Sequence, residues 1–173
     1  LRTASRYFAF PFDAEDLKQK IEEECRACDY RQDYRLRISL GKSGEIELSR
    51  QVLTPLGPSF CQAKLCLQEA NLQQAFTYFK TSYRPHLSLG EQEKIYHNQR
   101  GELLETSIGN LVLKIAGKLY TPSIRLGILP GIYRQHLLET GQIEEKVLTL
   151  ADLVQAEAIY GCNAVRALYK LSL

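Results

Sequence analysis

The sequence predicts an α+β fold, and three patterns along the chain indicate it. An amphipathic helix is expected from about Asp13, which can cap it, because Leu17 and Ile21 lie four residues apart on one side. Alternating apolar and polar residues over 34–40, followed by a glycine-containing turn, predict a half-buried strand with an antiparallel partner. Apolar runs of strand length after Glu105 predict a second sheet.

Length and composition are those of an ordinary globular protein. The chain has 173 residues, of which 45% are hydrophobic and 24% charged, enough for one good core or two small ones. Its net charge of +2 comes from intermingled charges of both signs, so neither nucleic acid nor an anionic membrane is expected as a partner. No apolar stretch approaches the roughly 20 residues that span a bilayer, and no secretory signal precedes the first predicted helix. We therefore expect a cytoplasmic protein.

The cysteines favour a reducing compartment. Their number is odd and their positions are scattered, which is unlike a disulfide framework: Cys25, Cys28, Cys61, Cys66 and Cys162. The Cys25-x2-Cys28 pair has no second pair at zinc-like spacing. We interpret both residues as ordinary helix positions and expect no metal site.

Turn and capping signals predict the remaining elements. Two prolines and a glycine within 54–58 predict a linker between two domains, 1–53 and 59–173. The predicted elements beyond the linker are a strand through Leu65 and Leu67, a short helix over 71–78, a strand over 93–97, a β-hairpin that turns at Ala116-Gly117, a helix from near Gly131 closed by Gly141, an extended segment over 143–148 and a helix capped by Thr149 with Asp152.

The helix start near Gly131 is the first sign of a binding site. Ile132, Leu137 and Leu138 are expected to form the apolar face of this helix. Small residues at a helix start leave backbone N–H groups free, and the helix dipole favours negative charge there. We therefore expect an anion to bind at this position, with Glu105 at the mouth of the preceding hairpin.

Several motifs in a fixed order resemble one known family. Glu105 and Asn110 form Glu-x4-Asn, which is followed by Tyr-Thr-Pro at 120–122 and Gly-Ile-Leu-Pro-Gly-Ile-x-Arg at 127–134. Together they resemble the class IV pyridoxal-phosphate enzymes, which include branched-chain and D-amino-acid aminotransferases and aminodeoxychorismate lyase. The resemblance implies a D-amino-acid aminotransferase-like fold. Its small N-terminal α/β domain is expected to be incomplete here, and its larger C-terminal domain is a pseudo-barrel.

A lysine element extends the resemblance. Phe-Lys-Thr-Ser-Tyr-Arg is similar to the Lys-x-x-Asn-Arg element in which lyases of the family place the cofactor-binding lysine. Lys80 and Arg84 match, whereas Tyr83 stands where the family usually has Asn. Glu105 follows Lys80 by 105 − 80 = 25 positions, fewer than expected for the family. We expect either a trimmed connection or residues absent from the numbered chain between Arg84 and Glu91.

The resemblance implies a role for each candidate residue. Lys80 would attach to the cofactor and move protons, and Glu105, in preference to Glu102, would keep the pyridine nitrogen protonated. The implied cofactor-binding set is Lys80, Arg84, Glu105, Asn110, Gly131, Ile132, Tyr133 and Asn163.

The cofactor phosphate is expected at the helix start. Backbone N–H groups of Ile132 and Tyr133 would bind it, together with Asn163, which falls in a segment that resembles the family's last strand and turn. In the family an arginine within His-x-x-Arg-Leu also binds the phosphate. Since the matching segment begins at Leu1, we expect that arginine upstream of Leu1 in the complete protein.

Three motifs are most similar to lyases of the family, notably those fused behind a chorismate-amidating synthase: Lys-Thr-Ser-x-Arg, Asn-Gln-Arg-Gly-Glu and Asn-Ala-Val-Arg. The implied reaction converts 4-amino-4-deoxychorismate into 4-aminobenzoate and pyruvate, in folate biosynthesis. A homodimer that is fused to, or cooperates with, aminodeoxychorismate synthase is implied as well. Two alternatives stay open, a class IV aminotransferase acting on branched-chain or D-amino acids and a cofactor-free remnant with a binding or dimerisation role.

Overall fold

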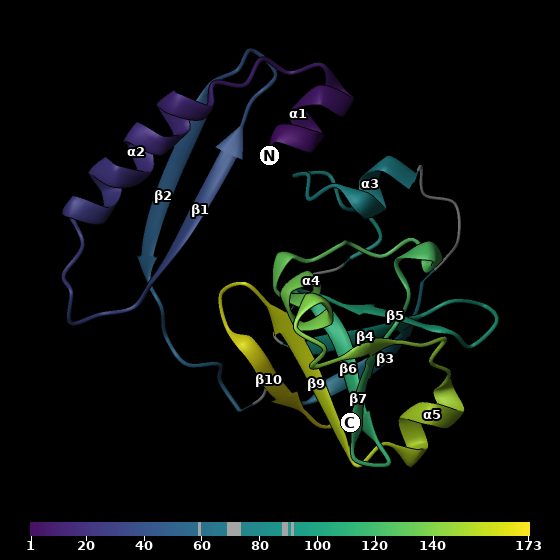
Figure 1. Cartoon of the computed structure of the whole chain (residues 1–173). Helices are drawn as coiled ribbons and strands as arrows, with labels where there is room; N and C mark the ends of the chain where they lie inside the picture. The colour runs from purple at the N-terminus through teal and green to yellow at the C-terminus, as the bar shows by residue number, and fades with distance from the viewer. Residues whose placement is uncertain (59, 69–73, 88–89, 91) are drawn as a thin grey trace. The chain divides into compact units, whose positions relative to one another are not determined.

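The chain forms two compact units, Leu1–Pro55 and Leu56–Leu173, in this computed structural model (Figure 1). The division falls inside the stretch 54–58, whose prolines and glycine predict the linker. The domain assignment of 1–53 and 59–173 stays a prediction. The structure describes residues 1–58, 60–68, 74–87, 90 and 92–173.

The first unit combines helices with a two-stranded sheet (Figure 1). Strands β1 and β2 pair antiparallel, from Tyr34 opposite Val52 to Leu40 opposite Ile46, so the predicted hairpin is confirmed. The elements are α1 (Arg2–Phe8), α2 (Ala14–Arg26), β1 (Tyr34–Leu40) and β2 (Ile46–Val52).

Helix α2 begins as predicted. The Asp13 carboxylate accepts hydrogen bonds from the backbone N–H groups of Glu15 and of the next residue, at 2.8 and 3.1 Å. The helix ends at Arg26, so the interpretation of both cysteines as helix positions is wrong for Cys28. A backbone bond from Cys28 to Cys25 tightens the last turn and takes Cys28 out of the helix.

Helix α1 is an element that the sequence did not predict. Leu1 precedes it and has no side chain that can cap a helix, so the usual start signal is missing. Within the helix, the Ser5 hydroxyl donates to the Arg2 carbonyl at 2.8 Å. At the other end Ala9 adopts φ 55°, a conformation for which glycine is the usual signal.

The second unit is built on an eight-stranded sheet in the order β10-β9-β6-β5-β4-β3, with β7 beside β6 and β8 beside β7. The pairs β3–β4 and β7–β8 are parallel, and the other pairs are antiparallel. The elements are β3 (Ala63–Leu67), α3 (Gln74–Tyr78), β4 (Glu93–His97), β5 (Leu103–Thr106), β6 (Asn110–Ile115), β7 (Lys118–Thr121), the 3-10 helix η1 (Ile124–Leu126), α4 (Ile132–Glu139), β8 (Glu144–Glu145), α5 (Leu150–Gln155), β9 (Ala158–Asn163) and β10 (Ala167–Leu171).

Most predicted elements of this unit are confirmed. The strand over 93–97 is β4, and the hairpin that turns at 116–117 is β6–β7. The Thr149–Asp152 capping box begins α5. Helix α3 covers the end of the helix predicted over 71–78, whose first three residues lie outside the described residues.

Within the segment 143–148, which was predicted to be extended, Glu144–Glu145 form a strand. This strand pairs with the end of β7. Ile143 and Leu148 on either side of it are buried, and the Leu148 carbonyl accepts a hydrogen bond from Leu103 at 2.8 Å. The apolar residues that flank this strand therefore fill the core.

Helix α4 packs on the sheet through one side only. Leu137 belongs to a cluster of buried residues with Val112 on β6 and Cys162 on β9. The prediction that Ile132 lies on the same face is wrong, because 79% of Ile132 is exposed. Five residues separate it from Leu137, which places the two side chains about 140° apart around the helix axis.

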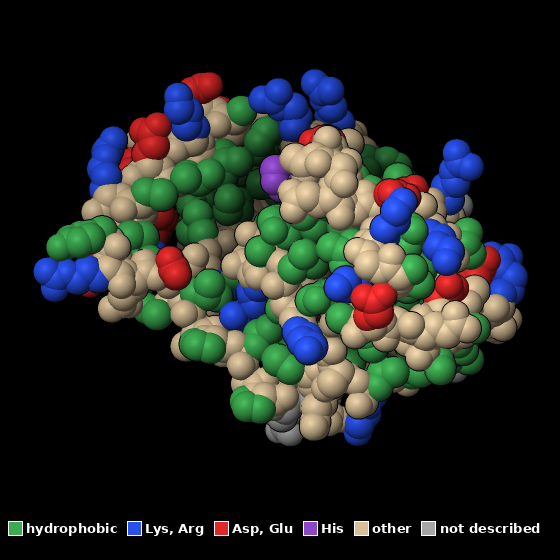
Figure 2. Space-filling model, turned by 60° about the horizontal axis from the view of Figure 1, so that its bottom comes forward, with side chains coloured by type: hydrophobic (Ala, Val, Ile, Leu, Met, Phe, Trp, Pro, Cys, Tyr) green, Lys and Arg blue, Asp and Glu red, His purple; other side chains and the backbone are tan. Residues whose placement is uncertain are grey.

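The surface shows no segregation of charge on the face drawn in Figure 2, where Lys and Arg side chains alternate with Asp and Glu side chains. None of the helices in the described ranges has the length and apolar character needed to cross a membrane. Within the same ranges, no group of three or more His, Cys, Asp or Glu residues could hold a metal ion.

Candidate active site

Glu105 lies at the centre of the candidate site. It is on β5, opposite Asn110 at the start of β6, and only 2% of the residue is exposed. Its Oε2 atom accepts a hydrogen bond from the Leu129 N–H at 3.4 Å. Its Oε1 atom is buried and has no hydrogen-bond partner among the described residues. One acceptor of a buried carboxylate is therefore left for another group.

Arg84 and His86 approach this carboxylate from the segment that contains Lys80. Arg84 Nη2 lies 3.7 Å from Oε2 of Glu105, and His86 Nε2 lies 4.0 Å from Oε1. The His86 side chain is fully buried, and that of Arg84 is 16% exposed. The buried atoms without a hydrogen-bond partner among the described residues are Arg84 Nε and Nη2, His86 Nδ1 and Nε2, and Glu105 Oε1.

Burial changes the protonation of both groups. It raises the pKa of Glu105 to about 7, although Arg84 and the Leu129 N–H act in the opposite direction. Burial and the neighbouring Arg84 charge lower the pKa of His86 to about 4. At neutral pH the imidazole is therefore uncharged, whereas Glu105 can hold or release a proton.

The start of helix α4 lies beside the same hairpin. Gly131 is its N-cap, and a glycine offers no side chain to the first N–H groups of the helix, which also lack partners within it. Asn110 Nδ2 donates to the Leu129 carbonyl at 2.7 Å. Because Glu105 accepts from the Leu129 N–H and Asn110 donates to the Leu129 carbonyl, the acid and the helix start are held together.

Arg134 fixes the direction of α4 from within the unit. Only 3% of this residue is exposed, and its guanidinium donates to the Pro122 carbonyl at 2.8 Å and to the Thr121 hydroxyl at 3.3 Å. It also forms an ion pair with Glu145. The last residue of the Gly-Ile-Leu-Pro-Gly-Ile-x-Arg motif is thus a buried support for the helix rather than a surface residue.

Asn163 uses its side chain to hold turns. Its Oδ1 atom accepts from the N–H groups of Val165 and Arg166, at 3.0 and 2.9 Å, at the turn between β9 and β10. Its Nδ2 atom donates to the Ile108 carbonyl at 3.3 Å, in the turn between β5 and β6. Since an amide nitrogen carries two hydrogens, one N–H of Asn163 has no hydrogen-bond partner among the residues that the structure describes.

Lys80 follows the end of α3 and is exposed. Beyond it, the Thr81 hydroxyl donates to the Tyr83 carbonyl at 2.7 Å, and the Tyr83 ring packs edge-on against Phe76 at 5.3 Å. The structure brings Arg84 to Glu105, so this segment reaches the candidate site four residues after the lysine.

The two remaining titratable side chains are a carboxylate that was predicted as a competitor of Glu105 and a histidine that was not predicted. Glu102, the competitor of Glu105, accepts from Asn98 at 2.6 Å and from Arg100 at 2.7 Å, near the turn before β5. Sequence patterns missed His86, because no motif and no spacing rule connects it with Glu105.

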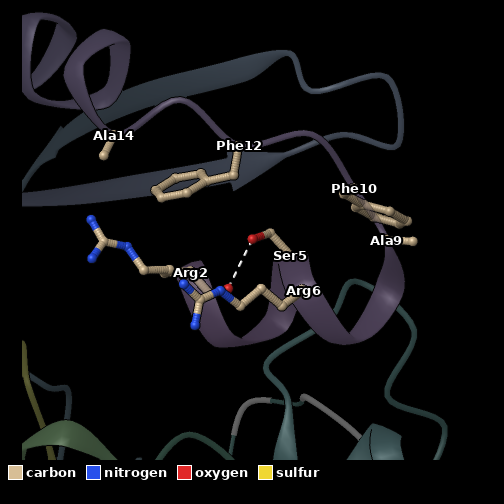
Figure 3. Close-up of a pocket in the computed structure, with 7 residues that line it drawn as sticks. All are labelled: Arg2, Ser5, Arg6, Ala9, Phe10, Phe12 and Ala14. Atoms are coloured by element: carbon tan, nitrogen blue, oxygen red, sulfur yellow. Dashed lines mark hydrogen bonds between the residues drawn. The ribbon is translucent and has the colours of Figure 1, made fainter.

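A separate cavity lies in the first unit (Figure 3). Its volume is about 350 Å³, and its lining includes Arg2, Arg6, Phe10 and Phe12, from α1 and the segment that follows it. No residue of the predicted cofactor-binding set lines this cavity. The cavity is therefore no part of the candidate site.

Replacing Gly131 by alanine should disturb the helix start. The added Cβ would lie 2.1 Å from Asn110 Oδ1, so Asn110 would have to move and lose its bond to Leu129. We expect the free energy of unfolding to fall by about 1–3 kcal/mol, as measured by urea denaturation. Gly90→Ala is the control, because a Cβ there meets no described atom within 4 Å. Equal losses in both variants would contradict the assignment.

The fold and the site define a class of protein in which a sheet places a buried carboxylate beside a helix N-terminus. The family model described as amino-transferase class IV matches residues 1–172, so this chain belongs to the class IV aminotransferase family. Members of that family are pyridoxal-phosphate-dependent enzymes. The predicted α+β fold of this family is confirmed.

Known relatives include both aminotransferases and lyases. A proposed amino-acid aminotransferase from Mesorhizobium loti has a TM-score of 0.85 and 28% identity, covering 99% of this chain and 86% of that one. The 4-amino-4-deoxychorismate lyase from Pseudomonas aeruginosa shares the fold, with a TM-score of 0.69, 18% identity and coverage of 99% and 73%. A proposed aminodeoxychorismate lyase from Schizosaccharomyces pombe is 32% identical over 82 residues, 46% of this chain and 36% of that protein. Alignments with curated relatives span 24 to 41% of the relatives' length.

Proposed function

We propose that the protein is a pyridoxal-phosphate-dependent lyase that converts 4-amino-4-deoxychorismate into 4-aminobenzoate and pyruvate, a step of folate biosynthesis. The observation that carries the cofactor assignment is the buried Glu105 oxygen without a described partner, held beside a helix start. A pyridinium N–H is a donor that suits this oxygen, and a phosphate suits the first N–H groups of α4. The Glu105 acceptor and the N–H donors of α4 together therefore fit pyridoxal phosphate.

Each candidate has a task in this proposal. Glu105 would hold a proton at the ring nitrogen, and its raised pKa of about 7 lets it keep or share that proton near neutral pH. The N–H groups of Ile132 and Tyr133 would bind the phosphate, joined by the remaining N–H of Asn163. Gly131 and Asn110 would shape this end of the site. When bound, pyridoxal phosphate supplies an electron sink next to the substrate nitrogen.

Lys80 would carry out the proton transfer. Lys80 would hold the cofactor through its amine until the substrate binds. The freed Lys80 amine would then remove the proton from the carbon that bears the substrate nitrogen. Loss of this proton would let the bond between the neighbouring ring carbon and the ether oxygen break. The enolpyruvate group would leave and take up a proton at its CH2 carbon to become pyruvate, while the substrate ring becomes aromatic.

The lyase is preferred to its alternatives on two grounds. The lysine element and the Asn-Ala-Val-Arg turn are most similar to lyases, and a proposed lyase from Schizosaccharomyces pombe is among the curated relatives. The second candidate, a class IV aminotransferase acting on branched-chain or D-amino acids, is favoured by the similarity to the Mesorhizobium loti protein. A cofactor-free remnant is the third candidate.

Pyruvate release separates these candidates. We expect the full-length protein, loaded with pyridoxal phosphate, to release pyruvate from 4-amino-4-deoxychorismate with no 2-oxo acid added, as measured by a coupled lactate dehydrogenase assay. An aminotransferase would need a 2-oxo acid as amino acceptor, and a remnant would stay inactive under both conditions. Activity that appears only after addition of the 2-oxo acid would rule out the lyase.

The assembly and location belong to the same proposal. We expect a homodimer, fused to or cooperating with aminodeoxychorismate synthase, because the lyase motifs resemble those of fused enzymes. All five cysteines are free thiols, which fits a reducing cytoplasm.

A further inference from the structure

The side chain of His86 covers the oxygen of Glu105 that is left for a ligand. His86 Nε2 lies 4.0 Å from Oε1, and Oε1 has essentially no surface accessible to water. On the other side of the carboxylate, Oε2 already has the Leu129 N–H at 3.4 Å and Arg84 at 3.7 Å. To hydrogen-bond to Oε1, the pyridine nitrogen of the cofactor would have to come within about 3 Å of it. The His86 imidazole and the cofactor ring would therefore compete for the same space.

The contacts of His86 are poor for a buried side chain. Both ring nitrogens are buried without a hydrogen-bond partner among the described residues, and 4.0 Å from Oε1 is too long for a hydrogen bond. Burying polar atoms in this way costs free energy that exposure to water would restore. A well-bonded structural histidine would instead donate at least one N–H to a neighbour.

The backbone around His86 permits a change of position. Arg84–Leu87 forms a single turn, closed by the Leu87 N–H donating to the Arg84 carbonyl at 3.1 Å. Leu87 anchors the end of the turn by packing against a cluster that contains Leu104 and Ile128. His86 is thus outside any helix or strand, and its side chain can rotate without breaking a sheet or helix bond.

We propose that His86 is a determinant of cofactor affinity, an imidazole that occupies the ring-nitrogen side of Glu105 and must be displaced before pyridoxal phosphate can bind there. This inference rests on the proposed function and deepens it. Arg84 would not need to move, because it lies beside Oε2, the other oxygen of Glu105. Because the buried imidazole is uncharged at neutral pH, its presence there does not add a second positive charge beside Arg84.

The test compares the binding of two probes by the full-length protein. Pyridoxal phosphate reports on the complete site, and pyridoxine 5′-phosphate reports on ring and phosphate contacts alone, because it lacks the aldehyde that reacts with lysine. We expect His86→Ala to lower the dissociation constant of pyridoxine 5′-phosphate by about tenfold, as measured by equilibrium dialysis. His86→Asn, which keeps a polar but smaller side chain, should lie between the wild type and His86→Ala. His136→Ala, at an exposed position on α4, is the control and should change nothing.

A second readout follows His86 itself. In the wild type, addition of pyridoxine 5′-phosphate should shift the His86 imidazole C–H signals in the NMR spectrum toward those of an exposed histidine. Unfolding curves of both variants would confirm that each is folded. Unchanged or weaker binding in both folded His86 variants, with the wild type still binding, would overturn this inference alone. Absence of binding of either probe in every protein would overturn the proposed function together with this inference.

Discussion

Replacing Lys80 by alanine is expected to lower turnover by about 10³-fold or more, because one amine both attaches to the cofactor and moves the substrate proton. Lys80 is exposed in this structure, so the Lys80→Ala protein is expected to fold. Turnover is measured as pyruvate release, and stability by urea denaturation.

The chemical readout for Lys80 does not depend on turnover. Borohydride reduction of the loaded wild type, followed by digestion and mass spectrometry, should find the cofactor on Lys80, and the Lys80→Ala protein should carry none. Lys64→Ala, at another exposed lysine in the same unit, is the matched control and should keep both activity and attachment. Cofactor found on a different lysine in the wild type would show that the lysine element was wrongly assigned.

The parts of the fold that the sequence could predict are those with local signals. Helix α2 has an Asp13 cap and an apolar stripe, and α5 has the Thr149–Asp152 capping box, so their starts follow from residues a few positions apart. Helix α1 has neither signal. It is closed by Ala9 in a left-handed conformation, where sequence patterns look for glycine.

The candidate site could be predicted only in part for a related reason. Glu105, Asn110 and Gly131 belong to motifs in a fixed order, and the structure brings them together around the Leu129 peptide. His86 reaches Glu105 through the path of a single turn, which no spacing rule describes. The burial that shifts the pKa of both groups is a property of tertiary packing and leaves no local pattern in the sequence.

Replacing Glu105 by glutamine should stabilise the chain at high pH when no pyridoxal phosphate is added. Burial raises the pKa of Glu105 from 4.5 to about 7, so the folded chain binds this proton more tightly than the unfolded chain. The contribution to stability is complete below pH 4.5 and is lost as the pH rises through about 7. Glutamine keeps the shape without the charge. At pH 8 the variant should be more stable than the wild type by on the order of 3 kcal/mol, and near pH 4 the two should be equal.

The same substitution should have the opposite effect on the loaded protein, and this reversal tests the role of Glu105 most directly. A carboxylate that accepts the pyridinium N–H is stabilised by the ligand, whereas a neutral amide is a weaker acceptor. Saturating pyridoxal phosphate should therefore raise the melting temperature of the wild type more than that of Glu105→Gln. Glu102→Gln is the control, because hydrogen bonds from Asn98 and Arg100 lower the pKa of Glu102 and its replacement should bring no gain at pH 8. If Glu105→Gln binds the cofactor as tightly as the wild type, the ring nitrogen is held by another group.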